Sequence, residues 1–200
     1  MARIYIFGDV ETTGLSEKTE RMTEIALVKT DHQFNIIDKF QMLINPERVI
    51  SAKITELTGI TEEMVENEKK YIAAYPEIYG WWYKDTTEED EIIFVAHNAP
   101  FDIKFINEGA NLILEKPLIT NFIDTVSIAR ELYPFWRNHK LDTCAKKFGV
   151  VNENHHRAMN DTMVLFYIGK RLIVEALEDG SFDPINFRTT KKLHYGKGNN

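Results

Sequence analysis

The chain of 200 residues carries a formal net charge of −7 and is 44% hydrophobic and 12% aromatic. This composition excludes a largely disordered chain and fits a globular protein with a substantial core. No stretch approaches the ~20 consecutive apolar residues of a membrane span, and the excess of acids argues against a simple basic nucleic-acid-binding module. The single cysteine, Cys144, rules out an intramolecular disulfide and fits a reducing cytoplasm, where we expect the protein.

Charge is unevenly distributed along the chain. Residues 181–200 contain four basic residues and one acid, a net charge of +3, which leaves −10 for residues 1–180. We expect one folded domain over 1–180 and a basic tail over 181–200 that is flexible or orders only on a partner. An acidic body of this kind would have to bind a polyanion through something other than its bulk charge, and bound divalent cations would serve.

Apolar runs and turn signals predict a domain that contains both strands and helices. A short turn at 31–33 separates two apolar runs, which favours an antiparallel hairpin. The order of the elements predicts a mixed five-stranded α/β sheet with helices on both faces. The predicted strands are 3–7, 23–30, 34–44, 92–96 and 119–123, and the main predicted helices are 51–57, 71–83, one from Asn98, one from Asp124 or Thr125 to before Pro134, 140–148 and 157–178.

Two acids, Asp9 and Glu11, follow the first apolar run. Side chains alternate along a strand, so both would point to the same face of the sheet, roughly 7 Å apart. Two carboxylates at that separation can hold one hard cation between them, or two cations side by side. The alternative interpretation is that both are solvated charges where a strand frays into a turn.

Two further acids, Asp102 and Asp161, each stand at the start of a predicted helix on its apolar face. A carboxylate directed into a core is costly unless it is paired or bound to metal. Two divalent cations would neutralise the four acids together. For each acid taken alone, the alternative is a helix N-terminal charge that the helix dipole favours.

Three motifs carry a family resemblance. They are Asp-Val-Glu-Thr-Thr-Gly-Leu at 9–15, His-Asn-Ala-Pro-Phe-Asp at 97–102 and His-Arg-Ala-Met-Asn-Asp at 156–161. Because these motifs occur in this order, the sequence resembles the DEDD superfamily of 3′–5′ exonucleases (the DnaQ-like fold) over roughly residues 3–178. It looks most like the DEDDh branch, which includes the proofreading exonuclease of bacterial DNA polymerase III. The resemblance implies an RNase H-like sheet and an exonuclease domain over 1–180.

The resemblance also implies roles for the acids. Asp9, Glu11, Asp102 and Asp161 match the metal-binding acids of the family, which would hold two Mg²⁺ or Mn²⁺ ions. His156 matches the histidine of the DEDDh branch, and we expect it to act as the general base on the attacking water. His155 stands one residue too far from Asp161 for this pattern and is interpreted as a neighbour without a catalytic role.

Substrate contacts are expected around the first two motifs. The chain would turn sharply at Gly14, and Thr12 and Thr13 would then meet the terminal nucleotide. Leu15 would wedge against the bases. The remaining two candidates are Asn98, for which helix capping alone is the alternative explanation, and Phe101, for which stacking on a base and simple core packing are both open.

These observations lead to a hypothesis about function. We expect a metal-dependent 3′–5′ exonuclease that releases nucleoside 5′-monophosphates from the 3′ end of single-stranded DNA, in proofreading or repair. One alternative is an exoribonuclease that trims RNA 3′ ends. Another is a catalytically silent nucleic-acid-binding or scaffold subunit. Expected partners are nucleic acid and a DNA polymerase or replication complex, with no membrane association.

Overall fold

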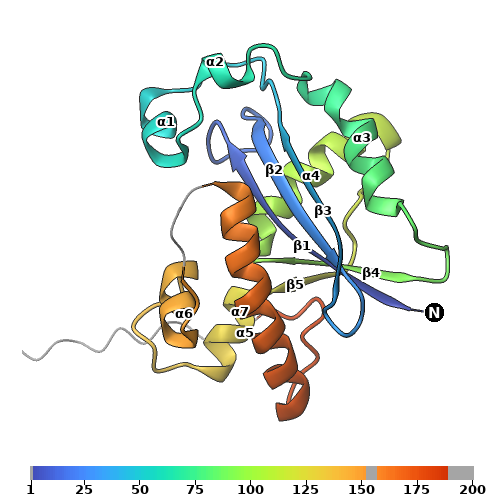
Figure 1. The fold of residues 1–200 in the computed structure, drawn as a ribbon, viewed down its shortest axis with the longest axis vertical. Helices are drawn as coiled ribbons and strands as arrows, with labels where there is room; N and C mark the ends of the chain where they lie inside the picture. Colours follow the sequence, from blue (N-terminus) through green and yellow to red (C-terminus); the bar gives the residue numbers. More distant parts are fainter. Residues whose placement is uncertain (1, 152–156, 189–200) are drawn as a thin grey trace, which may run out of the picture.

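The computed structural model describes residues 2–151 and 157–188. Its sheet has the order β3-β2-β1-β4-β5, in which β1 runs antiparallel to β2 and parallel to β4. The predicted mixed five-stranded sheet of the RNase H-like class is therefore confirmed (Figure 1). The strands are β1 (Arg3–Thr12), β2 (Met22–Thr30), β3 (Ile36–Leu43), β4 (Glu91–Ala96) and β5 (Phe122–Asp124).

Helices cover both faces of the sheet, as predicted. Two helices, α3 and α4, pack on one face, whereas α5, α6 and α7 pack on the other (Figure 1). The helices are α1 (Ala52–Thr58), α2 (Glu62–Val65), α3 (Tyr71–Tyr83), α4 (Ala99–Leu114), α5 (Thr125–Leu132), α6 (Leu141–Phe148) and α7 (Ala158–Asp179). None of the helices in the described part of the chain is long and apolar enough to cross a membrane.

Strand β1 divides its side chains between the two layers. Ile4 and Ile6 join the core beneath α3 and α4, while Tyr5 and Phe7 join the core beneath α7. Phe7 meets Phe166 of α7 edge-on, with ring centroids 5.3 Å apart. The same alternation puts the side chains at positions 9 and 11 on the α7 face.

Gly8 lets the sheet pack closely beside the first acid. A Cβ at this position would lie 2.6 Å from Phe94 Cε2 and 2.7 Å from Leu27 Cδ2. Both contacts are shorter than real Cβ atoms tolerate, so a side chain here would have to displace the Phe94 ring and the Leu27 side chain from the core.

Three predicted strands agree with the structure to within two residues at each end, and two differ by more. The first was expected to end at Phe7, but β1 continues to Thr12 because β2 pairs with it along this whole length. The fifth was expected over 119–123 but begins at Phe122. Here the Asn107 side chain accepts from Leu118 N and Ile119 N, and donates to Ile119 O, so these backbone groups are not available for a strand.

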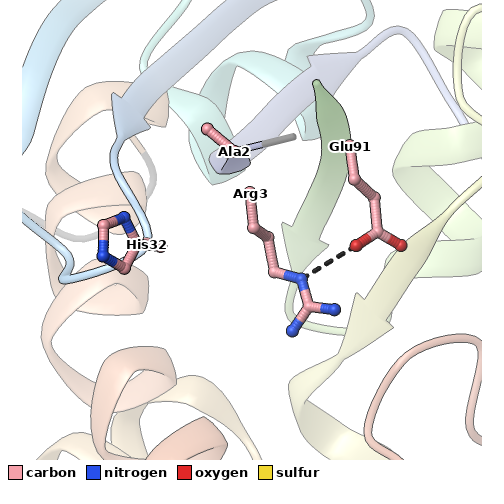
Figure 2. Close-up of a pocket in the computed structure, with 4 residues that line it drawn as sticks. All are labelled: Ala2, Arg3, His32 and Glu91. Carbon is pink, nitrogen blue, oxygen red and sulfur yellow. Dashed lines mark hydrogen bonds and ion pairs between the residues drawn. The ribbon is translucent and has the colours of Figure 1, made fainter. Parts of the chain in front are cut away.

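The N-terminal ends of β1 and β4 lie side by side. Arg3 and Glu91 are paired in the parallel register, and Arg3 Nε donates to Glu91 Oε2 at 2.9 Å (Figure 2). Together with Ala2 and His32 they line a hollow of about 430 Å³. Both charged side chains are partly exposed, so the pair contributes at most ~1 kcal/mol to stability. This end of the two strands is remote from the acids at positions 9 and 11.

The segment after α7 packs back on the sheet as far as residue 188. Phe182 and Ile185 contact the core beneath α7. Asn186 N donates to Phe122 O at 2.7 Å, and Asn186 Oδ1 accepts from Phe122 N at 3.0 Å. The boundary at 180 and the flexible tail stay predictions, because residues 189–200 lie outside the described part of the chain.

Candidate active site

Three carboxylates from two elements meet beside the C-terminal half of β1. Asp9 and Glu11 point from the same face of the strand, and Asp161 lies in the first turn of α7, which crosses that face. One oxygen of each can be chosen so that all three lie within 4.8 Å of one another. The structure thus brings together three of the four predicted metal-binding acids.

The start of α7 is fixed by a buried acid of β2. Glu24 is fully buried and stands opposite Glu11 in the antiparallel register. Its carboxylate accepts from Ala158 N at 3.2 Å and from Arg157 Nη2 at 3.2 Å, and Gln41 Nε2 adds a third bond at 2.8 Å. Ala158 is three residues before the acid of α7, so these bonds position that acid over β1. Sequence reasoning missed Glu24, although an acid inside the apolar run 23–28 was a visible signal.

The fourth predicted acid, Asp102, approaches from the opposite layer. It lies in the first turn of α4, is 3% exposed, and its Oδ1 accepts from Val10 N at 3.2 Å. It is not among the three carboxylates within 4.8 Å, but it lines the same cleft. A backbone N–H between Asp9 and Glu11 therefore anchors this acid beside them.

Asn98 was expected to cap the following helix with its side chain, and this expectation is wrong. The residue has a left-handed conformation, with φ 73°, and its side chain makes no capping bond. Instead, Asp124 Oδ1 accepts from Asn98 N at 3.0 Å and from Ala99 N at 3.3 Å. The Asp124 carboxylate at the end of β5 thus caps α4 in place of the Asn98 side chain. The exposed Asn98 side chain lines the cleft.

The segment after β1 is held in a defined position. Thr12 Oγ1 donates to Gly14 O at 2.7 Å, and Thr13 Oγ1 bonds to the Glu20 carboxylate. The chain bends at Gly14, as expected, although this glycine does not adopt a positive φ. Its role is spatial, because a Cβ would lie 2.9 Å from Glu20 Cγ. The segment ends in Leu15, whose side chain is 80% exposed.

Lys104 of α4 ties this segment to the cleft wall. Its Nζ donates to Leu15 O and lies 3.5 Å from Glu17 Oε2. The same ammonium lies 5.1 Å from the ring centroid of Phe101. Phe101 both lines the cleft and packs against the core through Phe105, so both of its expected roles remain compatible with its position.

A partly buried histidine, His97, also lines the cleft. His97 Nε2 donates to His139 O at 2.8 Å, and its Nδ1 contacts Thr125 Oγ1 at 2.9 Å. Burial lowers the pKa of His97 to about 4, so the ring stays neutral at physiological pH. It positions the chain before α6 rather than carrying charge. This role was not foreseen, because it depends on a partner 42 residues away.

The cleft encloses about 440 Å³. It is lined by residues of the first two sequence motifs, by Asp161 and by the start of α6. His156, the expected general base, and His155 both lie outside the described residues. The lining residues are Asp9, Val10, Glu11, His97, Asn98, Phe101, Asp102, Lys140, Leu141, Asp142 and Asp161.

The acids destabilise one another when ionised. Burial, and then repulsion from Asp102 and Glu11, raises the pKa of Asp9 well above its usual range. Burial and repulsion from Asp161 raise the pKa of Glu11 to about 8. Burial also raises the pKa of Asp102 to about 8, against the opposing effect of its bond from Val10 N. Such a set fits hard divalent cations, which would balance the negative charge of the ionised acids.

The raised pKa values predict a pH-dependent stability of the metal-free protein. Below about pH 3, Glu11 and Asp102 are protonated in both the folded and the unfolded chain. Between about pH 4.5 and 8, the unfolded chain releases these protons while the folded chain keeps them, so stability falls as pH rises. We expect the Tm in EDTA to decrease from pH 5 to pH 8.5. We also expect the increase of Tm on adding Mn²⁺ to grow over the same range.

Differential scanning fluorimetry across this pH range measures both effects. The matched control is the double variant Glu11→Gln/Asp102→Asn, whose EDTA profile should be flatter because two of the titrating groups are gone. A wild-type Tm in EDTA that does not depend on pH, or that rises toward pH 8.5, would contradict the shared repulsion.

Comparison with known proteins agrees with the geometry. The family model described as "Exonuclease" (RNase_T) matches residues 6–168. The chain is 40% identical over 177 residues to the "DNA polymerase III PolC-type" of Bacillus subtilis, an alignment that covers 88% of this chain and 12% of that protein. The chain thus spans about an eighth of the length of this curated relative.

Solved structures share the fold. A structure of exonuclease X in complex with 5′ overhanging duplex DNA aligns over 91% of this chain and 95% of that chain, with 26% identity and a TM-score of 0.62. A zinc-bound Escherichia coli ExoI–ssDNA complex aligns over 89% of this chain and 43% of that chain, with 18% identity and a TM-score of 0.75. With the family model matching most of its length, the chain belongs to the exonuclease family.

Proposed function

We propose that this protein is a metal-dependent 3′–5′ exonuclease that releases nucleoside 5′-monophosphates from single-stranded DNA. The observation that carries the proposal is the convergence of Asp9, Glu11 and Asp161 within 4.8 Å, beside a buried Asp102. Carboxylates are the ligands that Mg²⁺ and Mn²⁺ prefer, and their mutual repulsion in this site fits a pair of cations.

The proposal assigns each acid a task. Two bound Mg²⁺ or Mn²⁺ ions would activate the water and stabilise the charge on the scissile phosphate and its leaving oxygen. Asp9, Glu11 and Asp161 hold the ions, and Asp102 completes the set from α4. His156, five residues before Asp161, takes the proton of the attacking water, since imidazole titrates close to neutral pH.

The terminal nucleotide is proposed to lie between the segment after β1 and the start of α4. The exposed Leu15 is held next to α4 by Lys104, which favours a wedge against the terminal bases. Phe101 and the Asn98 side chain, which makes no capping hydrogen bond, line the same cleft. Backbone and hydroxyl groups of the segment 12–14 would contact the sugar and phosphate. These contacts ignore base identity and suit a nuclease without sequence preference.

DNA is the favoured substrate because the similar proteins named above include a DNA polymerase and exonucleases solved with DNA. An exoribonuclease would use the same acids, so only an experiment distinguishes it from a DNA exonuclease. A silent scaffold is disfavoured, because a protein that only binds gains nothing from three carboxylates forced together at a cost to its stability. We further propose that the enzyme works in the cytoplasm with a DNA polymerase or replication complex.

Digestion of 5′-labelled single-stranded DNA and RNA tests the activity. With Mg²⁺ we expect a ladder on DNA that shortens from the 3′ end, and no cleavage in EDTA. Asp102→Ala should lower the rate more than about 100-fold, since even outer-shell partners of metal ligands cost 10- to 100-fold. His156→Ala should lower the rate about 10²- to 10⁴-fold at neutral pH.

Each outcome of this digestion decides between the candidates. Cleavage confined to RNA would favour the exoribonuclease, and internal cuts would rule out an exonuclease. An intact substrate under every condition would favour the silent scaffold. Full activity of His156→Ala would remove the histidine from the mechanism while leaving the metal site in place.

A further inference from the structure

The segment Tyr133–Phe148, which we call the basic wall, carries a net positive charge in an otherwise acidic chain. It contains Arg137, Lys140, Lys146 and Lys147 against a single acid, a net charge of +3 in a chain of −7. All four basic side chains are exposed. Lys140 also lines the cleft, so the positive surface is continuous with the site of the acids.

Stacked rings make the first half of the basic wall rigid. Tyr133 and Trp136 stack with centroids 4.3 Å apart and planes inclined by 11°, and Trp136 stacks on His139 at 5.9 Å. Trp136 N donates to Tyr133 O at 3.1 Å, and His139 Nε2 donates to the same oxygen at 2.9 Å. His97 then ties His139 O to the end of β4. The loop is therefore held in a fixed position relative to the cleft.

Phe135 stands out on this rigid loop because its side chain is 98% exposed. Its neighbour Trp136 lies within the ring stack, so exposure of the adjacent ring does not result from a loosely packed loop. Phe135 and Lys140 are five positions apart in the sequence, so at most about 18 Å of chain lies between them. An exposed aromatic ring flanked by cations, beside a nuclease cleft, has the chemistry of a platform for unpaired bases.

We propose that the basic wall binds the single strand upstream of the 3′ end, with a base stacked on Phe135 and phosphates beside Arg137 and Lys140. The inference rests on the proposed function for the direction of the strand. Stacking on an aromatic ring accepts every base, and the cations neutralise the backbone, so this contact raises affinity without selecting sequence. It also explains how an acidic protein attracts a polyanion before the strand reaches the acids.

Two assays on the full chain test the platform. The first is equilibrium binding of a fluorescein-labelled ten-nucleotide single strand, with Ca²⁺ in place of Mg²⁺ to limit cleavage. We expect Phe135→Ala to weaken binding about 5- to 100-fold. Arg137→Gln should make the dependence of log Kd on log salt less steep by about 0.7.

The second assay compares substrates that do and do not reach the wall. Phe135→Ala should raise KM for the ten-nucleotide strand with little change in kcat. It should leave hydrolysis of thymidine 5′-monophosphate p-nitrophenyl ester unchanged, because that ester fills only the cleft. The control is Tyr83→Ala, which removes a 42% exposed ring at the end of α3, on the opposite face of the sheet.

The outcomes separate the platform from the proposed function. If Phe135→Ala binds the strand as tightly as Tyr83→Ala does, the platform is wrong even where the wild type degrades DNA. If the wild type degrades nothing but Phe135→Ala weakens binding, the platform stands and the exonuclease does not. Equal losses on the strand and the small ester would also overturn the platform, because Phe135 would then support the cleft itself.

Discussion

Glu11→Gln is expected to abolish nuclease activity and at the same time to stabilise the metal-free protein. The carboxylate is partly buried beside Asp9 and Asp161, and burial and repulsion from Asp161 raise its pKa to about 8, so the folded site resists its ionisation. A neutral amide of the same size removes that repulsion. It also removes a proposed metal ligand, which should lower the rate more than about 100-fold.

The two effects have opposite signs and can be measured on one protein preparation. At pH 8 in EDTA we expect the Tm of Glu11→Gln to exceed that of the wild type by several degrees, at ~2–4 °C per kcal/mol for a chain of this size. With Mn²⁺ the order should reverse, because the wild type gains more from the metal.

Glu63→Gln is the matched control, since Glu63 is an exposed acid on α2 outside the cleft. It should change neither the activity nor the Tm in EDTA appreciably. A Glu11→Gln protein that is less stable than the wild type in EDTA would mean that Glu11 contributes favourable contacts outweighing the repulsion. Retained activity would remove Glu11 from the metal site.

Local patterns predicted those parts of the fold that local chemistry determines. The alternation from Ile4 to Glu11 correctly put both acids of β1 on one face, because a strand fixes side-chain direction by itself. The helix Tyr71–Tyr83 was predicted with its bounds, despite Pro76 inside it. The strand 119–123 was misplaced because the Asn107 side chain binds its backbone from another element.

In the candidate site, too, local sequence features could be predicted and tertiary contacts could not. Acids that break an apolar pattern could be identified from sequence, since burying them is costly without metal. The groups that hold these acids in place could not. Glu24 acts through a helix more than 130 residues away, and Asp124 replaces the cap that Asn98 was expected to provide. These roles arise from tertiary neighbours, and one sequence without its fold does not contain them.

The site thus combines two kinds of carboxylate with opposite effects on stability. Asp9 and Glu11 gather near Asp161 at a cost, as the raised pKa values of the two β1 acids indicate. Glu24 and Asp124 instead accept hydrogen bonds from several backbone or side-chain donors each, and these bonds tie β2 and β5 to the starts of the neighbouring helices. Glu24 fixes the start of α7 and Asp124 fixes the start of α4. These two helices carry acids of the site toward Asp9 and Glu11.

Glu24→Ala is therefore expected to damage both stability and metal binding. The substitution leaves Ala158 N and the Arg157 guanidinium without their acceptor, at ~1–3 kcal/mol for a buried donor and more for a charged one. It also relieves the repulsion that Glu24 exerts on Glu11, which partly offsets the loss. We expect a net decrease of ~3 kcal/mol in the free energy of unfolding, or about 6–12 °C in Tm. Movement of Asp161 with the helix start should weaken Mn²⁺ binding about 10- to 100-fold.

Thermal unfolding in EDTA and a Mn²⁺ titration of the folded protein measure the two losses separately. Glu47→Ala removes an exposed acid that pairs with Lys70 at 2.9 Å and should cost no more than ~1 kcal/mol, which separates burial from ion pairing as such. Glu24→Gln keeps an oxygen for Arg157 but turns a donor toward Ala158 N, so it should fall between the wild type and Glu24→Ala. If Glu24→Ala lost stability but bound Mn²⁺ like the wild type, the acid would support the fold without positioning Asp161.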